Sequence, residues 1–136
     1  MTLTLVALAA SAATHSISLD HHGTAVEAVY SARTDIDART IGAHTPNRMD
    51  GRRCQWTATV MVDRALAHGP AMARTIASDR SFSGTHAGAC SSDKSGIHRE
   101  IAAREGEIRA HLVAVAERDR PVLTAELASL RSLAAN

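Results

Sequence analysis

The sequence predicts an α+β protein with an antiparallel sheet of about five strands, followed by one long or two shorter C-terminal helices. Up to Cys90, apolar and polar residues alternate with a period of two, which is typical of half-buried strands. Beyond Cys90, apolar residues recur at helical spacing. This change of period divides the chain into a β region at 13–90 and a helical tail at 91–136, which packs on the sheet or projects from it.

The segment 53–62 shows the clearest alternation and holds the only Trp of the chain. Trp56 is the largest apolar side chain available, so we expect its face of the strand to line the core. The opposite face is mostly polar. The residues expected to point into the core are Cys54, Trp56, Ala58, Val60 and Val62.

The other strands are predicted from shorter stretches of alternation, separated by Gly, Pro, Asn and Asp. A bend is expected near Thr34, and because two Asp residues disfavour a strand interior, the exact position of the break is left open. The expected strands are 15–20, 24–33, 35–42, 53–64, 72–77 and the short 81–83, with turns at 21–23, 45–51, 67–70 and 78–80.

The helical tail shows a narrow apolar stripe. Asp93 or Ser95 can cap its start, and Pro121 is expected to end the first helix at about Asp119 and to open a second one. The stripe consists of Ile97, Ile101, Ile108, Leu112 and Val115, and the second helix continues with Leu123, Leu127, Leu130 and Ala134.

Aromatic residues make up only 2% of the chain, so the core is expected to be thin and to need a covalent staple. Cys54 and Cys90 are 36 positions apart and show no metal-binding spacing. They predict a single disulfide in an oxidising compartment, stabilising the fold by about 4 kcal/mol. Two unrelated buried thiols in a cytosolic protein remain the alternative.

The N-terminus indicates export. An apolar run at 3–10, too short to span a bilayer, is followed by Ala10-Ser11-Ala12, the small-x-small form that signal peptidase reads. We therefore predict a signal peptide at 1–12, a periplasmic or secreted mature protein and no integral membrane segment in it. No Lys or Arg precedes Arg33, which leaves open an upstream start or an ordinary apolar N-terminal strand.

Three local motifs lie within residues 15–90: His21-His22-Gly23 in an early hairpin, Cys54-Gln55-Trp56 in a strand, and Gly88-Ala89-Cys90 after a Gly-rich turn. In these motifs the chain resembles a group of small exported bacterial proteins that carry no assigned activity. The resemblance implies export and a disulfide, and it omits the helical tail.

The eight histidines raise the question of a metal site, with His21, His22 and His44 as candidates. Exposed histidines in turns and loops are the alternative, because no ligand pair at HExxH or similar spacing is present. No nucleophile elbow or phosphate-binding loop occurs either, so we predict no enzyme and no cofactor. A net charge of +1 without a basic block predicts no nucleic-acid binding.

The tail is the best functional indication in the sequence. Its stripe either packs on the sheet or mediates association with a second copy or a protein partner. We accordingly predict an exported, non-enzymatic interaction or structural protein; the alternative is a small-ligand or metal-binding module that uses the sheet face and the His-rich turns. The residues expected to mediate association are Ile101, Ile108, Leu112 and Val115.

Overall fold

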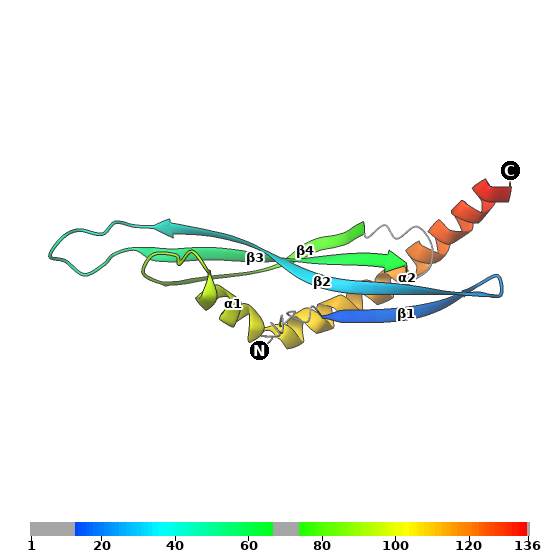
Figure 1. Cartoon of the computed structure of the whole chain (residues 1–136), viewed down its shortest axis with the longest axis horizontal. Coiled ribbons are helices and arrows are strands. Elements are labelled where there is room, and N and C mark those ends of the chain that lie inside the picture. The colour runs from blue at the N-terminus through cyan, green and yellow to red at the C-terminus, as the bar shows by residue number, and fades with distance from the viewer. Residues whose placement is uncertain (1–12, 67–73, 136) are drawn as a thin grey trace, which may run out of the picture.

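The computed structural model describes residues 13–66 and 74–135. Within them the chain is α+β, as predicted, with four antiparallel strands in the order β1-β2-β3-β4 and helices packed on the sheet (Figure 1). The signal peptide predicted at 1–12, the turn predicted at 67–70 and the first residues of the strand predicted at 72–77 lie outside the described residues. The elements are β1 Thr14–His21, β2 Thr24–Ile41, β3 Arg53–Leu66, β4 Arg74–Ala87, α1 Ser95–Ala102 and α2 Glu105–Ala135.

The sheet has fewer strands than expected because two predicted breaks are absent. β2 runs through Thr34 without a bend, and its two aspartates, Asp35 and Asp37, are exposed, so their poor fit to a buried strand costs little. β4 likewise runs through the turn predicted at 78–80, where its register with β3 shifts between Val60 and Asp63. Such an irregularity accommodates an extra residue without ending the strand.

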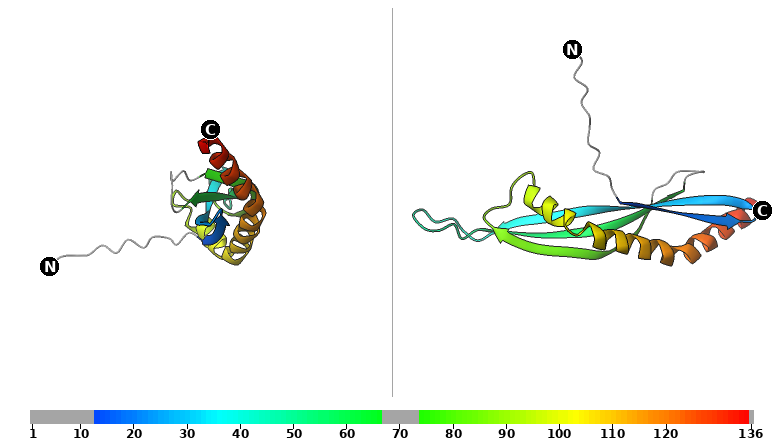
Figure 2. Two further views of the ribbon diagram at one scale, coloured as in Figure 1. Left: turned by 90° about the vertical axis from the view of Figure 1, so that its right-hand side faces the viewer. Right: turned by 90° about the horizontal axis from the view of Figure 1, so that it is seen from below.

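The sheet is a long, twisted ribbon. β2 has 18 residues, which at about 3.3 Å per residue correspond to roughly 60 Å. The β1–β2 hairpin lies at one end of the ribbon and the β2–β3 connection at the other, while α2 runs lengthwise beside the strands (Figures 1 and 2). Groups at the two ends of β2 are therefore far apart.

The helical tail also differs from the prediction. Pro121 lies inside α2, which continues to Ala135, so the expected end near Asp119 is wrong. The break occurs instead between α1 and α2, at Ala103 and Arg104. Arg104 lies over the ring of Phe82, 4.9 Å from its centroid, so this turn is held against β4. None of the helices in the described ranges is long and apolar enough to cross a membrane.

The core lies between the helices and one face of the sheet, which we call the inner face; the opposite face is the outer face. The disulfide between Cys54 and Cys90 is present and ties β3 to the segment after β4. Trp56 is 2% exposed and lies over Gly84, where a Cβ atom would come within 2.8 Å of the indole. The predicted core residues are confirmed: Cys54, Trp56, Ala58, Val60 and Val62 are all buried.

Candidate functional site

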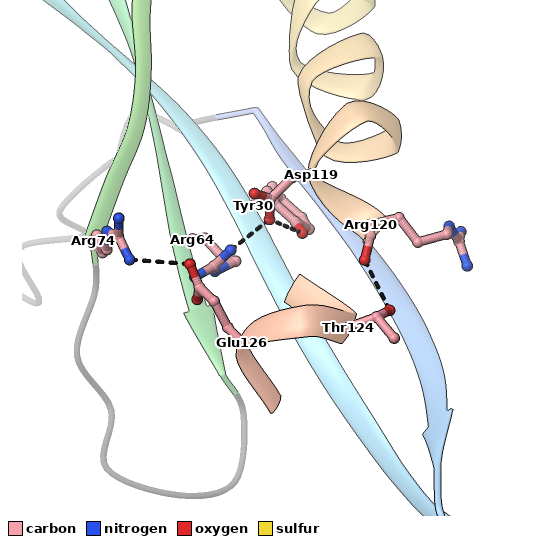
Figure 3. A network of polar contacts seen from close by, with 7 residues as sticks. All are labelled: Tyr30, Arg64, Arg74, Asp119, Arg120, Thr124 and Glu126. Atoms are coloured by element: carbon pink, nitrogen blue, oxygen red, sulfur yellow. Dashed lines mark hydrogen bonds and ion pairs between the residues drawn. The ribbon is translucent and has the colours of Figure 1, made fainter. Parts of the chain in front are cut away.

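A polar cluster joins α2 to the sheet (Figure 3). The hydroxyl of Tyr30 donates to Oδ2 of Asp119 at 2.7 Å, and the same oxygen accepts a bond from Nη1 of Arg64, also at 2.7 Å. The second guanidinium nitrogen of Arg64 donates to Glu126, which also accepts from Arg74 at 3.2 Å. Two cations and two carboxylates thus balance one another between three strands and one helix.

Strand register and helical spacing bring these residues together. Tyr30 and Arg64 are cross-strand partners on β2 and β3, and both point from the inner face toward α2. Asp119 and Glu126 are seven residues apart on α2, which places them two turns apart on one side of the helix. Arg64 can therefore reach both carboxylates at once.

Burial makes this cluster energetically significant. Arg64 is 7% exposed and Asp119 is 8% exposed, so neither charge is well hydrated and each requires the other. Burial, together with the hydrogen bond to Asp119, raises the pKa of Tyr30 well above its ordinary value, so the phenol stays protonated and donates. Burial alone would lower the pKa of Arg64, but Asp119 and Glu126 outweigh it and raise the pKa. The cluster fixes α2 on the sheet.

Two adjoining depressions flank this cluster along α2. One, of about 500 Å³, lies between the start of β4 and the helix, and Asp119 is part of its wall. The other, of about 600 Å³, continues past Glu126 to Leu130. Val122 borders both, so they form one open groove beside the second half of α2.

The apolar stripe of α2 continues beyond the part that the sheet covers. Leu123 is 1% exposed, whereas Leu130 is 60% and Leu133 is 74% exposed. At 100° per residue, both leucines fall on the same side of the helix as the buried Leu112. The C-terminal end of α2 rises away from the strands, so this part of the stripe faces solvent (Figure 1).

The residues predicted to mediate association lie elsewhere. They belong to the intramolecular core, so the sheet already covers them and they are not at the surface for a partner. Farther along the same stripe, the positions that are exposed are Val122, Leu130 and Leu133. The four predicted positions are Ile101 and Ile108, each 8% exposed, Leu112 at 0% and Val115 at 4%.

The three candidate metal ligands do not converge. His21 and His22 lie at the β1–β2 turn, with ring centroids 4.4 Å apart in an edge-on arrangement. His44 follows the far end of β2 and lies 3.7 Å from Asp50. In the part of the chain that the structure describes, no three His, Cys, Asp or Glu side chains are grouped to hold a metal ion.

A small depression on the outer sheet face is relevant to the alternative of a small-ligand module. It has a volume of about 250 Å³, below the usual range for ligand pockets of about 300–1,000 Å³. Its lining is polar, and Arg39 already donates twice to the side chain of Gln55. The lining residues are Asp37, Arg39, Gln55 and Thr57.

The polar cluster was missed from the sequence, although a signal for it exists. Arg64 falls on the apolar side of the alternation that begins at Cys54, where a charge requires a partner. Asp119 likewise falls within the apolar stripe of the tail, where its charge also requires a partner. Spacing alone could not show that these two residues, 55 positions apart, meet each other.

A scan against protein-family models and searches of curated proteins and of solved structures found no match. The resemblance to small exported bacterial proteins therefore stays a prediction. Function has to be inferred from the geometry of the chain's own residues.

Proposed function

We propose that the protein is an exported, non-enzymatic interaction protein of the periplasm or the extracellular space, and that it binds a protein partner through the C-terminal third of α2. One observation carries the proposal: the apolar stripe that the sheet buries up to Leu123 continues, exposed, at Leu130 and Leu133. Large apolar side chains aligned on one exposed helix face are typical of a docking surface.

Export is supported by two features. The disulfide between Cys54 and Cys90 is a bond that persists in oxidising compartments. The sequence at 1–12 has the form of a signal peptide that ends at Ala12. Cleavage there would leave Ala13, whose carbonyl accepts a bond from the backbone N–H of Ala32, at the mature N-terminus.

The exposed positions favour a helical partner. Val122, Leu130 and Leu133 are spaced by eight and then three residues, so they form one row along α2. A second amphipathic helix can pack its own apolar row against such a surface. Full burial of three side chains that are already partly covered would contribute roughly 3–5 kcal/mol. This free energy of burial is small once the entropic cost of association is subtracted, so the contact is expected to be reversible.

A non-catalytic role is supported by the way the buried polar groups are used. Tyr30 and Arg64 both donate to Asp119, so each of these three buried groups has a partner inside the fold. Glu126 is likewise held by two arginines. Groups engaged in this way hold the helix in place and orient its exposed end.

Photo-crosslinking in the exporting cell tests the proposal. A benzophenone amino acid at Leu133 is expected to give a discrete adduct with another protein. This adduct should disappear when the change Leu130→Asp is added. The same probe at Ser132, an exposed neighbour on the other side of the helix, is the matched control and is expected to give none. Identical adducts from both positions would contradict a docking surface.

Two measurements complete the test. The variant Leu130→Asp/Leu133→Asp should melt like Ala128→Asp/Ser132→Asp, because all four positions are exposed. Intact-mass analysis of the protein from its own cell should show a chain that begins at Ala13. Retention of Met1 in a cytosolic fraction would refute export.

A further inference from the structure

Among the described residues, the second half of β2 has a strand on one side alone. β1 pairs with β2 from Thr24 to Ser31, and β3 pairs with it on the other side from Ala28 to Ile41. No strand of the described residues lies beside β2 from Arg33 to Ile41 on the β1 side. In Figure 1 this half of β2 forms the upper margin of the sheet, with β3 below it. We call this margin the free edge.

The free edge presents regularly spaced backbone groups. The N–H of Ala32 points to this side, because it donates to the carbonyl of Ala13 at 3.1 Å. Backbone groups alternate along a strand, so those of every second residue after Ala32 point the same way. An edge of this kind is a template for another strand. The residues concerned are Thr34, Ile36, Ala38 and Thr40.

Charges of both signs accompany the free edge on the outer face. Asp35, Asp37 and Arg39 are consecutive outer-face residues, and all three are exposed. Neither aspartate forms an ion pair with another of the described residues, and Arg39 bonds only to the neutral amide of Gln55. A row with both signs can complement a copy of itself, whereas a row of one sign would repel it.

We propose that the free edge pairs with the free edge of a second copy of this chain, antiparallel, about a two-fold axis at Ala38. In this register Asp37 lies opposite Arg39 of the second copy, and Arg39 lies opposite its Asp37. Two cross-strand ion pairs form, and the half-buried Ala38 meets Ala38 of the second copy on the inner face. The two sheets join into one.

The charge order selects this register. In the dimer, outer-face side chains must lie opposite outer-face side chains of the second copy. The two-fold axis must therefore pass through a residue and not between two residues, so each alternative register has its axis at another residue of β2. Each other axis between Asp35 and Arg39 sets at least one like-charged pair directly opposite. An axis at Asp37, for example, places two copies of Asp37 against each other, and an axis at Ile36 places Asp35 against Asp37. Within this range only the axis at Ala38 avoids this. An axis at Thr34 would set Asp35 against Arg33, but it would also place Asp37 opposite Ser31, where β1 already pairs with β2.

This surface is separate from the C-terminal end of α2, so the dimer and the proposed partner contact are independent; the dimer rests only on the proposed removal of residues 1–12. The free edge contributes backbone hydrogen bonds and ion pairs, whereas the helix end contributes apolar side chains. The double change Leu130→Asp/Leu133→Asp is therefore expected to leave the chain dimeric. Crosslinking at Leu133 tests the partner contact and sedimentation tests the dimer, so the failure of one proposal does not affect the test of the other.

Sedimentation analysis of charge variants tests the dimer. The wild-type mature chain is expected to be a dimer, whereas Asp37→Arg and Arg39→Asp each create two like-charged pairs and should weaken it by roughly tenfold or more. Arg53→Asp is the matched control, because Arg53 lies on the outer face of the interior strand β3, between Ile41 and Ala87, and therefore cannot lie directly opposite a residue of the second copy. This control should remain dimeric.

Mixing the two variants shows whether they are monomeric because the interface is lost or because the chain is unfolded. An Asp37→Arg chain and an Arg39→Asp chain face each other with opposite charges at both positions, so an equimolar mixture should form a heterodimer. The double variant Asp37→Arg/Arg39→Asp should also dimerise, because it exchanges the partners of each pair. A monomeric wild type, a mixture that stays monomeric, or dissociation by Arg53→Asp would each overturn the proposal.

Discussion

The hydroxyl of Tyr30 lies 2.7 Å from Oδ2 of Asp119 and donates a hydrogen bond to it, joining β2 to α2 across 89 positions of sequence. Arg64 donates to the same oxygen. Because this contact is buried, it fixes both the rotation and the position of α2 on the sheet. The exposed end of the helix, and the surface proposed for partner binding, depend on this orientation.

Removal of the Tyr30 hydroxyl should destabilise the fold in a pH-dependent way. Tyr30→Phe is expected to lower the free energy of unfolding at neutral pH by about 1.5–3 kcal/mol, since the lost bond has a charged acceptor. The raised pKa of Tyr30 means that the folded state holds the phenolic proton more tightly than the unfolded state. Wild-type stabilisation is therefore complete below about pH 10 and is lost as the pH rises from there toward the folded pKa.

Urea unfolding at neutral pH and at about pH 10.5 checks this expectation, since an unfolded Tyr ionises near pH 10. The difference between wild type and Tyr30→Phe should narrow at the higher pH. A difference that stays constant with pH would show that the hydroxyl proton is not linked to folding.

Removing one partner of the Arg64–Asp119 ion pair should lower the free energy of unfolding more than replacing both partners by apolar residues. Arg64→Met leaves Asp119 buried without its cation and is expected to lower the free energy of unfolding by about 3–5 kcal/mol. Arg64→Met/Asp119→Leu removes both charges and should be clearly more stable than the sum of the single changes predicts. A double-mutant cycle by chemical denaturation measures the coupling, and additive effects would contradict the contact.

The contact between Trp56 and Gly84 leaves no room for a side chain. A Cβ atom at Gly84 would lie 2.8 Å from the indole, so Gly84→Ala should displace Trp56 and cost about 1–3 kcal/mol. Near-UV circular dichroism of the only Trp should report the change. Gly106→Ala is the control, because no atom lies within 4 Å of its Cβ position in α2, and it should stabilise the helix by about 0.5–1 kcal/mol. Equal effects at both sites would contradict the packing.

The disulfide should carry a large share of the stability. Reduction of the bond between Cys54 and Cys90, 36 positions apart, is expected to lower the free energy of unfolding by about 4 kcal/mol through loop-closure entropy. Unfolding curves with and without reductant measure this loss, and Cys54→Ala/Cys90→Ala should be insensitive to reductant. Peptide mapping without reductant should recover the two cysteines in one linked peptide pair.

Local patterns in the sequence determined the fold class, the inner face of β3 and the pairing of the two cysteines. Alternation from Cys54 to Val62 places these residues on one side of any strand they form, whatever surrounds it. A chain with only two cysteines leaves one intramolecular pairing. The same local reasoning was wrong at Thr34 and Pro121, where β2 and α2 continue. Strand pairing with β3 outweighs the weak local preference at Thr34. At Pro121 the cluster on either side, with Asp119 and Glu126, offsets a local cost of about 3 kcal/mol.

The tertiary structure alone decided which part of the apolar stripe is covered. Periodicity makes Leu112 and Leu130 equivalent, but the sheet lies over the first and not over the second. It also decided that Arg64 meets Asp119, and that no strand of the described residues lies on one side of the second half of β2. Each of these facts depends on contacts between segments far apart in the chain. Such contacts are set by strand register and by where each element ends in space, neither of which is encoded in the spacing of nearby residues.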